Sequence, residues 1–71
     1  MDIADLTSDQ RLALDLVADE GSGEWAPGSG VRLRSDAHMA SVLDSLVPLG
    51  LVAPMGGGRY GLTGAAFQLL R

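Results

Sequence analysis

Residues 41–63 have the sequence SVLDSLVPLGLVAPMGGGRYGLT, from which most of the predicted fold follows. The stretch begins with a helical pattern that Pro48 loosens and Gly50 ends, because proline lacks a backbone donor and glycine favours the left-handed conformation found after helices. Two strand-like runs separated by three glycines follow, which predicts a hairpin over residues 51–62. Pro54 restricts the first strand of this hairpin to an edge or bulge position.

The hairpin is flanked by two predicted helices. The helix before it, about residues 35–47, begins with Ser35 as its N-cap. Its buried face is a set of apolar residues at helical spacing: Met39, Val42, Leu43 and Leu46. The helix after it, about residues 64–70, is expected to turn Phe67 and Leu70 toward the core.

A further helix is predicted near the N-terminus, over about residues 8–20. Thr7 and Gln10 have the spacing of a capping box, and Gly21 is a natural end. The expected buried stripe follows the one, three and four spacing of a helix: Leu12, Ala13, Leu16 and Val17. Leu14 then falls roughly opposite this stripe, where it could form a second contact surface.

Residues 21–30 contain four glycines and one proline, a composition that predicts a loop. Trp25 in its middle is expected to cover the core, with an exposed recognition aromatic as the alternative. Residues 31–34 alternate apolar and basic side chains, which predicts a short edge strand. The expected architecture is one small α+β domain spanning residues 1–71, with the element order α-β-α-β-β-α.

Composition excludes several classes of protein. The 71 residues are 46% hydrophobic and include no cysteine and one histidine, so disulfides are excluded and a zinc centre is disfavoured. No apolar run is long enough to cross a membrane, and the acidic start at residues 1–5 is unlike a basic signal peptide. We therefore expect a cytoplasmic protein. It is expected to be no enzyme and to need no cofactor or metal, because no catalytic set or nucleotide fingerprint is present.

Charge is distributed unevenly along the chain. Residues 1–24 carry a net charge of −6 and residues 25–71 a net charge of +2, giving −4 in total. All five cations are arginine, which suits bidentate contacts with phosphate or guanine. We expect at least one of Arg32 and Arg34 to pair with the acidic end of the first helix.

Three segments resemble the second half of a winged helix-turn-helix domain, as in MarR-like bacterial and phage regulators: residues 42–46, 49–52 and 57–63. In that family a recognition helix ends in a Leu-Gly-Leu-Val-type element. A glycine-tipped wing follows, and a Leu-Thr pair begins the next helix. The resemblance implies a winged-helix-like fold in which residues 21–30 replace the family's middle helix.

The resemblance implies a DNA-binding transcriptional regulator. Its candidate DNA contacts lie on the wing, the expected strand and the recognition helix: Arg59, Arg32, Arg34, Ser35, His38 and Ser41. Because one copy carries little positive charge, a symmetric homodimer is favoured.

An alternative hypothesis is an acidic protein–protein interaction module. A phage-encoded inhibitor of a host nucleic-acid enzyme or defence complex would fit, because clustered acids can occupy a site built for phosphate. The candidate contacts with a host protein are Leu14, Asp15, Asp19, Glu20 and Trp25.

Overall fold

The computed structural model describes residues 2–71, which begin with a short 3-10 turn, Ile3–Asp5, and helix α1, Ser8–Asp19. The predicted capping box is confirmed. Thr7 Oγ1 accepts a hydrogen bond from the Gln10 amide at 3.1 Å, and Gln10 Oε1 accepts one from the Thr7 amide at 2.9 Å. These bonds satisfy amides that the first turn of a helix cannot pair internally.

Helix α2, Asp36–Leu46, is also confirmed, with Ser35 as its N-cap. Its end is a Schellman motif in which the Leu51 amide donates to the carbonyl of Leu46 at 3.3 Å, and the Gly50 amide to that of Val47 at 3.0 Å. Gly50 has a φ of +76°, the left-handed conformation that this motif requires. The motif directs the chain from the end of α2 into the hairpin.

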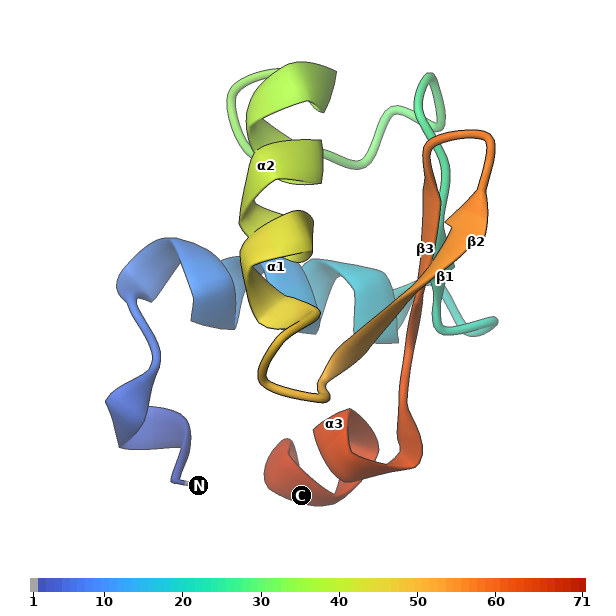
Figure 1. The fold of residues 1–71 in the computed structure, drawn as a ribbon. Helices are drawn as coiled ribbons and strands as arrows, with labels where there is room; N and C mark the ends of the chain where they lie inside the picture. Colours follow the sequence, from blue (N-terminus) through green and yellow to red (C-terminus); the bar gives the residue numbers. More distant parts are fainter. Residues whose placement is uncertain (1) are drawn as a thin grey trace.

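The hairpin consists of β2, Val52–Gly56, and β3, Arg59–Leu62, and it belongs to a three-stranded antiparallel sheet with the order β1-β3-β2 (Figure 1). The pairing register shifts between Pro54 and Gly56. Pro54 therefore lies on an edge strand beside an irregularity, as predicted from its missing amide hydrogen.

The predicted strand over residues 31–34 is wrong, because the first strand is β1, Glu24–Trp25, inside the predicted loop. Trp25 pairs with Tyr60 across the sheet and is 1% exposed. Burial of the large Trp25 side chain favours pairing of residues 24–25 with β3. Residues 31–34 do not form the predicted strand, because the positive φ of Arg34 is incompatible with an extended backbone. The chain is nevertheless a small α+β domain with the predicted order α-β-α-β-β-α.

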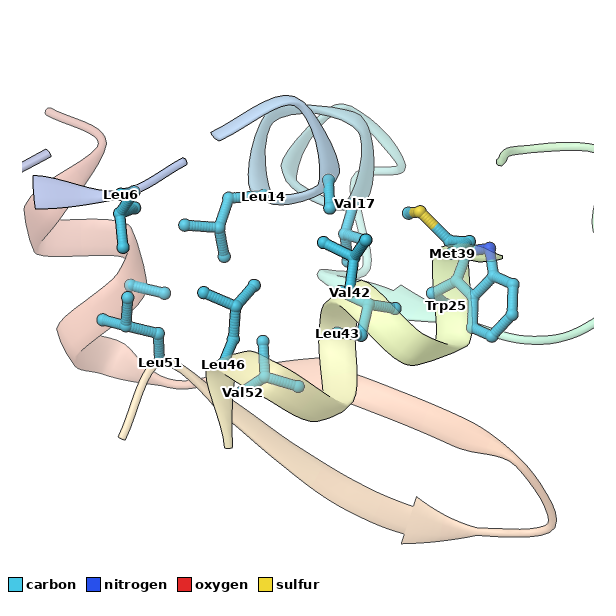
Figure 2. Close-up of a cluster of buried hydrophobic side chains, with 12 residues drawn as sticks. Leu6, Leu14, Val17, Trp25, Met39, Val42, Leu43, Leu46, Leu51 and Val52 are labelled. Atoms are coloured by element: carbon cyan, nitrogen blue, oxygen red, sulfur yellow. The ribbon is translucent and has the colours of Figure 1, made fainter. Parts of the chain in front are cut away.

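The core lies between α1, α2 and the sheet. Figure 2 shows Leu14 directed into a cluster with Leu6 and Leu46, while Trp25 and Met39 lie at the other end. The predicted orientation of α1 is therefore wrong: Leu14 is completely buried, and Leu12 is 50% exposed. Helical spacing is compatible with burial of either Leu12 or Leu14. In the structure, α1 is rotated so that Ala13, Leu14 and Val17 face the core.

Helix α3, Gly64–Leu69, follows the hairpin as predicted. Thr63 caps it by accepting a hydrogen bond from the Ala66 amide at 3.3 Å, and it donates to the carbonyl of Gly50 at 2.6 Å. Ala66 makes the buried contact, whereas Phe67, expected in the core, is 43% exposed. The short helix turns Phe67 toward Gly23 at the start of β1 instead.

Candidate nucleic-acid interface

One end of the molecule combines the hairpin tip and the segment that precedes α2 (Figure 1). We call residues 26–35 and 56–59 the basic end, because they contain three arginines and no acidic residue. An added Cβ at Gly58 would lie 3.2 Å from Pro27 Cγ, so the loop rests against the hairpin tip. The two segments therefore form one continuous surface.

Two side chains outside the basic end hold its loop in place. The Trp25 indole N–H donates to the carbonyl of Val31 at 2.5 Å, and the Gly28 amide donates to Asp36 Oδ2 at 2.9 Å. The Asp36 carboxylate is thus directed at the loop backbone, and its Oδ1 is buried without a hydrogen-bond partner among the described residues. These contacts order a segment that its glycine content would otherwise leave free to move.

Arg32 and Arg34 are exposed on this loop. Residues 2–71 contain two ion pairs, and neither involves these arginines. The expectation that one of them pairs with the acidic end of α1 is therefore wrong. Their guanidinium groups face solvent and are accessible to an external anion.

Arg59, at the start of β3, forms an ion pair on the sheet. Its Nη2 donates to Glu24 Oε1 at 3.0 Å, and the two side chains are 54% and 38% exposed. Surface pairs of this kind are worth little, typically under about 1 kcal/mol. Separating Arg59 from Glu24 therefore costs little free energy.

The three α2 candidates differ in what they contact. His38 Nε2 lies 3.0 Å from Asp9 Oδ2, and this contact connects α2 to α1. Ser35 Oγ accepts the His38 amide at 3.1 Å as the N-cap. Ser41 is exposed and makes no side-chain hydrogen bond to any described residue. Ser35 and His38 thus have structural roles, and Ser41 alone is free for an external contact.

Sequence reasoning missed Asp9 and Glu24, the partners of His38 and Arg59. They lie 29 and 35 residues from these partners, and no local pattern connects either pair. Only the three-dimensional arrangement of α1 against α2, and of β1 against β3, brings them together.

The alternative set of contact residues is divided between the core and the surface. Leu14 and Trp25 are buried, so neither has the exposure that contact with a partner protein requires. Asp15, Asp19 and Glu20 are exposed. Leu12, which sequence reasoning placed in the core, lines a shallow hollow of about 240 Å³ together with Ser8, Arg11 and Asp15.

Within the described chain, no group of three or more potential metal ligands is close enough to hold an ion. No helix among residues 2–71 is long and apolar enough to cross a membrane. No protein-family model, curated protein or solved structure was found to match this chain.

Proposed function

We propose that this protein is a small DNA-binding transcriptional regulator, of bacterial or phage type, that contacts DNA through its basic end. The observation that carries the proposal is the close approach of Pro27 to Gly58, which joins the loop that holds Arg32 and Arg34 to the hairpin tip beside Arg59. The acids that flank this surface are engaged, since Glu24 pairs with Arg59 and Asp36 accepts the Gly28 amide. Neither contact removes the charge of an acid, so Arg32, Arg34 and Arg59 against Glu24 and Asp36 leave this surface with a local net charge of +1, on a chain whose net charge is −4.

The chemistry of the surface favours contacts with the phosphate backbone. Arginine guanidinium groups form bidentate hydrogen bonds with phosphate, and such contacts position a protein on DNA without reading its sequence. The exposed residues of α2 include Ser41, Asp44 and Ser45, which lack the bidentate donors of strong base readout. We therefore expect affinity to come mainly from the hairpin and the loop.

A symmetric homodimer would double the number of phosphate contacts. Three arginines per copy give a modest electrostatic contribution, and two copies on adjacent half-sites would bind more tightly through effective concentration. Mass-resolved chromatography with and without a short duplex measures this directly, and we expect a complex of two chains per duplex.

The test of the proposal is fluorescence anisotropy with a labelled duplex of about 25 base pairs, two and a half helical turns, at several salt concentrations. Arg32→Ala and Arg59→Ala should each weaken binding and lower the slope of log affinity against log salt by about 0.9 per lost phosphate contact. Arg11→Ala removes the same charge from exposed α1 and is the matched control. Absence of binding by the wild type, or equal weakening by Arg11→Ala, would contradict the proposal.

A second candidate is an acidic module that binds a host nucleic-acid enzyme. The observation that favours it is the outer surface of α1, where half-exposed Leu12 adjoins the exposed acids Asp15 and Asp19. A basic nucleic-acid site would complement this surface. Asp15→Lys combined with Asp19→Lys should abolish retention of such an enzyme from host lysate, and Arg32→Ala should leave retention unchanged. Retention that survives the charge reversal rejects this candidate.

A further inference from the structure

Arg34 has a backbone conformation that ordinarily belongs to glycine. Its φ is +66°, and the Ser35 amide donates to the carbonyl of Leu33 at 2.6 Å, which closes a three-residue turn around Arg34. Eight other positions among residues 2–71 have a positive φ, and every one of them is a glycine. The described chain thus places glycine wherever the backbone becomes left-handed, with Arg34 as the single exception.

The backbone itself gives no reason for arginine at this position. A left-handed conformation brings Cβ close to the neighbouring carbonyl, and this clash destabilises any residue with a side chain relative to glycine. Asparagine and aspartate tolerate the conformation better than arginine does. On backbone grounds alone, position 34 should therefore hold glycine or asparagine.

Contacts within the described chain do not explain the arginine either. The Arg34 side chain is exposed and makes no hydrogen bond or ion pair with residues 2–71. The nearest acid in sequence, Asp36, directs its Oδ2 toward the Gly28 amide. The strain at position 34 is thus not offset by an internal partner, and strain of this kind is concentrated at functional sites.

We propose that Arg34 binds a backbone phosphate of the DNA, and that its strained conformation is retained because it directs the guanidinium outward from the basic end. This inference rests on the proposed function and assigns one of its phosphate contacts to a single residue. Arg32 lies on the same loop and Arg59 follows the hairpin tip that Pro27 approaches at Gly58, so both would contact neighbouring phosphates. The guanidinium supplies the paired donors that a phosphate accepts.

The test compares thermal stability with duplex affinity in the same variants. Arg34→Gly should raise Tm by about 3 °C, because it removes the backbone clash. The same variant should weaken duplex binding about tenfold, because it removes a charge-assisted contact. Arg34→Lys should keep most of the affinity without raising Tm. Binding of a labelled duplex and thermal unfolding followed by circular dichroism provide the two readouts.

Two controls separate strain from charge. Arg32→Gly introduces glycine two residues away, where φ is not positive, and should leave Tm unchanged or lower it. Arg11→Ala removes one positive charge outside the basic end and should leave duplex affinity within twofold of the wild type. A gain in Tm confined to Arg34→Gly, together with its loss of affinity, supports the inference.

Three results would overturn it, and they are distinguishable. A Tm for Arg34→Gly no higher than that of Arg32→Gly, which carries the same entropic cost of glycine, shows that position 34 is not strained. Unchanged affinity of Arg34→Gly, in a protein whose binding is weakened by Arg32→Ala and Arg59→Ala, assigns the phosphate contact to the other arginines while the proposed function stands. A wild type that binds no duplex overturns the proposed function and, with it, the ligand assigned to Arg34.

Discussion

The indole nitrogen of Trp25 donates a hydrogen bond to the backbone carbonyl of Val31, six residues further along the chain. The same ring is 1% exposed and lies 6.3 Å from the Tyr60 ring, measured between centroids. Trp25 therefore belongs to the core and also holds the loop that carries Arg32 and Arg34. A change in this side chain should affect both the stability of the fold and the order of the basic end.

Trp25→Phe should lower the free energy of unfolding by about 2 kcal/mol, because the smaller ring leaves a cavity and the Val31 carbonyl loses its donor. Denaturant titration measures this loss, and hydrogen exchange should show faster exchange of the amides in residues 26–33. Tyr60→Phe is the control, since the Tyr60 hydroxyl makes no hydrogen bond to the described residues. Equal losses in the two variants would show that the Trp25 hydrogen bond contributes nothing.

The orientation of α1 is tested by two leucines two residues apart. Leu14→Ala should lower the free energy of unfolding by about 2–5 kcal/mol, because Leu14 is completely buried. Leu12→Ala should change it by less than about 0.5 kcal/mol, because Leu12 is half exposed. Chemical denaturation of the two variants gives the comparison. A larger loss of stability for Leu12→Ala than for Leu14→Ala would show that Leu12 faces the core, as the sequence pattern predicted.

Gly23 and Gly61 should respond differently to the same substitution. An added Cβ at Gly23 would lie 2.8 Å from the far end of the exposed Phe67 ring, at a φ of +71°, so Gly23→Ala should cost about 1–2 kcal/mol from the backbone and a smaller amount to displace the ring. An added Cβ at Gly61 would lie 2.9 Å from Met55 Sδ. Met55 is half exposed and free to move, so Gly61→Ala should cost less than about 0.5 kcal/mol.

Thermal or chemical unfolding of both glycine variants checks this difference. Gly50→Ala is a useful third variant, since its φ is +76° and no atom lies within 4 Å of the added Cβ. Its stability should fall between the other two, because it carries the backbone strain without the steric contact. A Gly61→Ala variant less stable than Gly23→Ala would contradict the packing described for Phe67.

Glu24 competes with DNA for Arg59 in the proposed function. Glu24→Gln removes the carboxylate 3.0 Å from Arg59 Nη2 and should tighten duplex binding about two- to fivefold at low salt, as expected for a weak surface pair. The gain should disappear in the Arg59→Ala background. Anisotropy titrations of the two single variants and the double variant provide the double-mutant cycle. A gain in duplex affinity that persists without Arg59 would mean that Glu24 acts only through its contribution to the overall charge.

The contact between Asp9 and His38 should contribute modestly to stability. The two side chains are 40% and 31% exposed, so solvent weakens their interaction. A double-mutant cycle with Asp9→Asn and His38→Gln should give a coupling energy below about 1 kcal/mol. A coupling above about 2 kcal/mol would indicate that the pair behaves as a buried contact.

Elements defined by local signals were predictable from the sequence. Thr7 and Ser35 cap helices through bonds to amides three residues later, and Gly50 ends a helix through bonds within one turn. Pro54 has no amide hydrogen, and this alone restricts it to an edge strand or a bulge. Each of these features depends on residues within about six positions, so a local pattern is sufficient to reveal it.

Features that depend on distant segments were not predictable. The rotation of α1 is set by what faces it, and the spacing of Leu12 and Leu14 fits either orientation. Strand β1 has two residues and forms because Trp25 pairs with Tyr60, 35 residues away. The positive φ of Arg34 contradicts the alternating pattern around it, because alternation records polarity and carries no information about the handedness of the backbone.

Pro54 has a consequence for the behaviour of the protein in concentrated solution. Strand β2 is an open border of the sheet, and a border with an unbroken row of amide donors is a template on which further chains can add to form fibrils. Proline leaves a gap in that row, and the irregular register between Pro54 and Gly56 bends the strand at the same place. Pro54 therefore makes this border a poorer template for the addition of further chains than an unbroken edge strand would be.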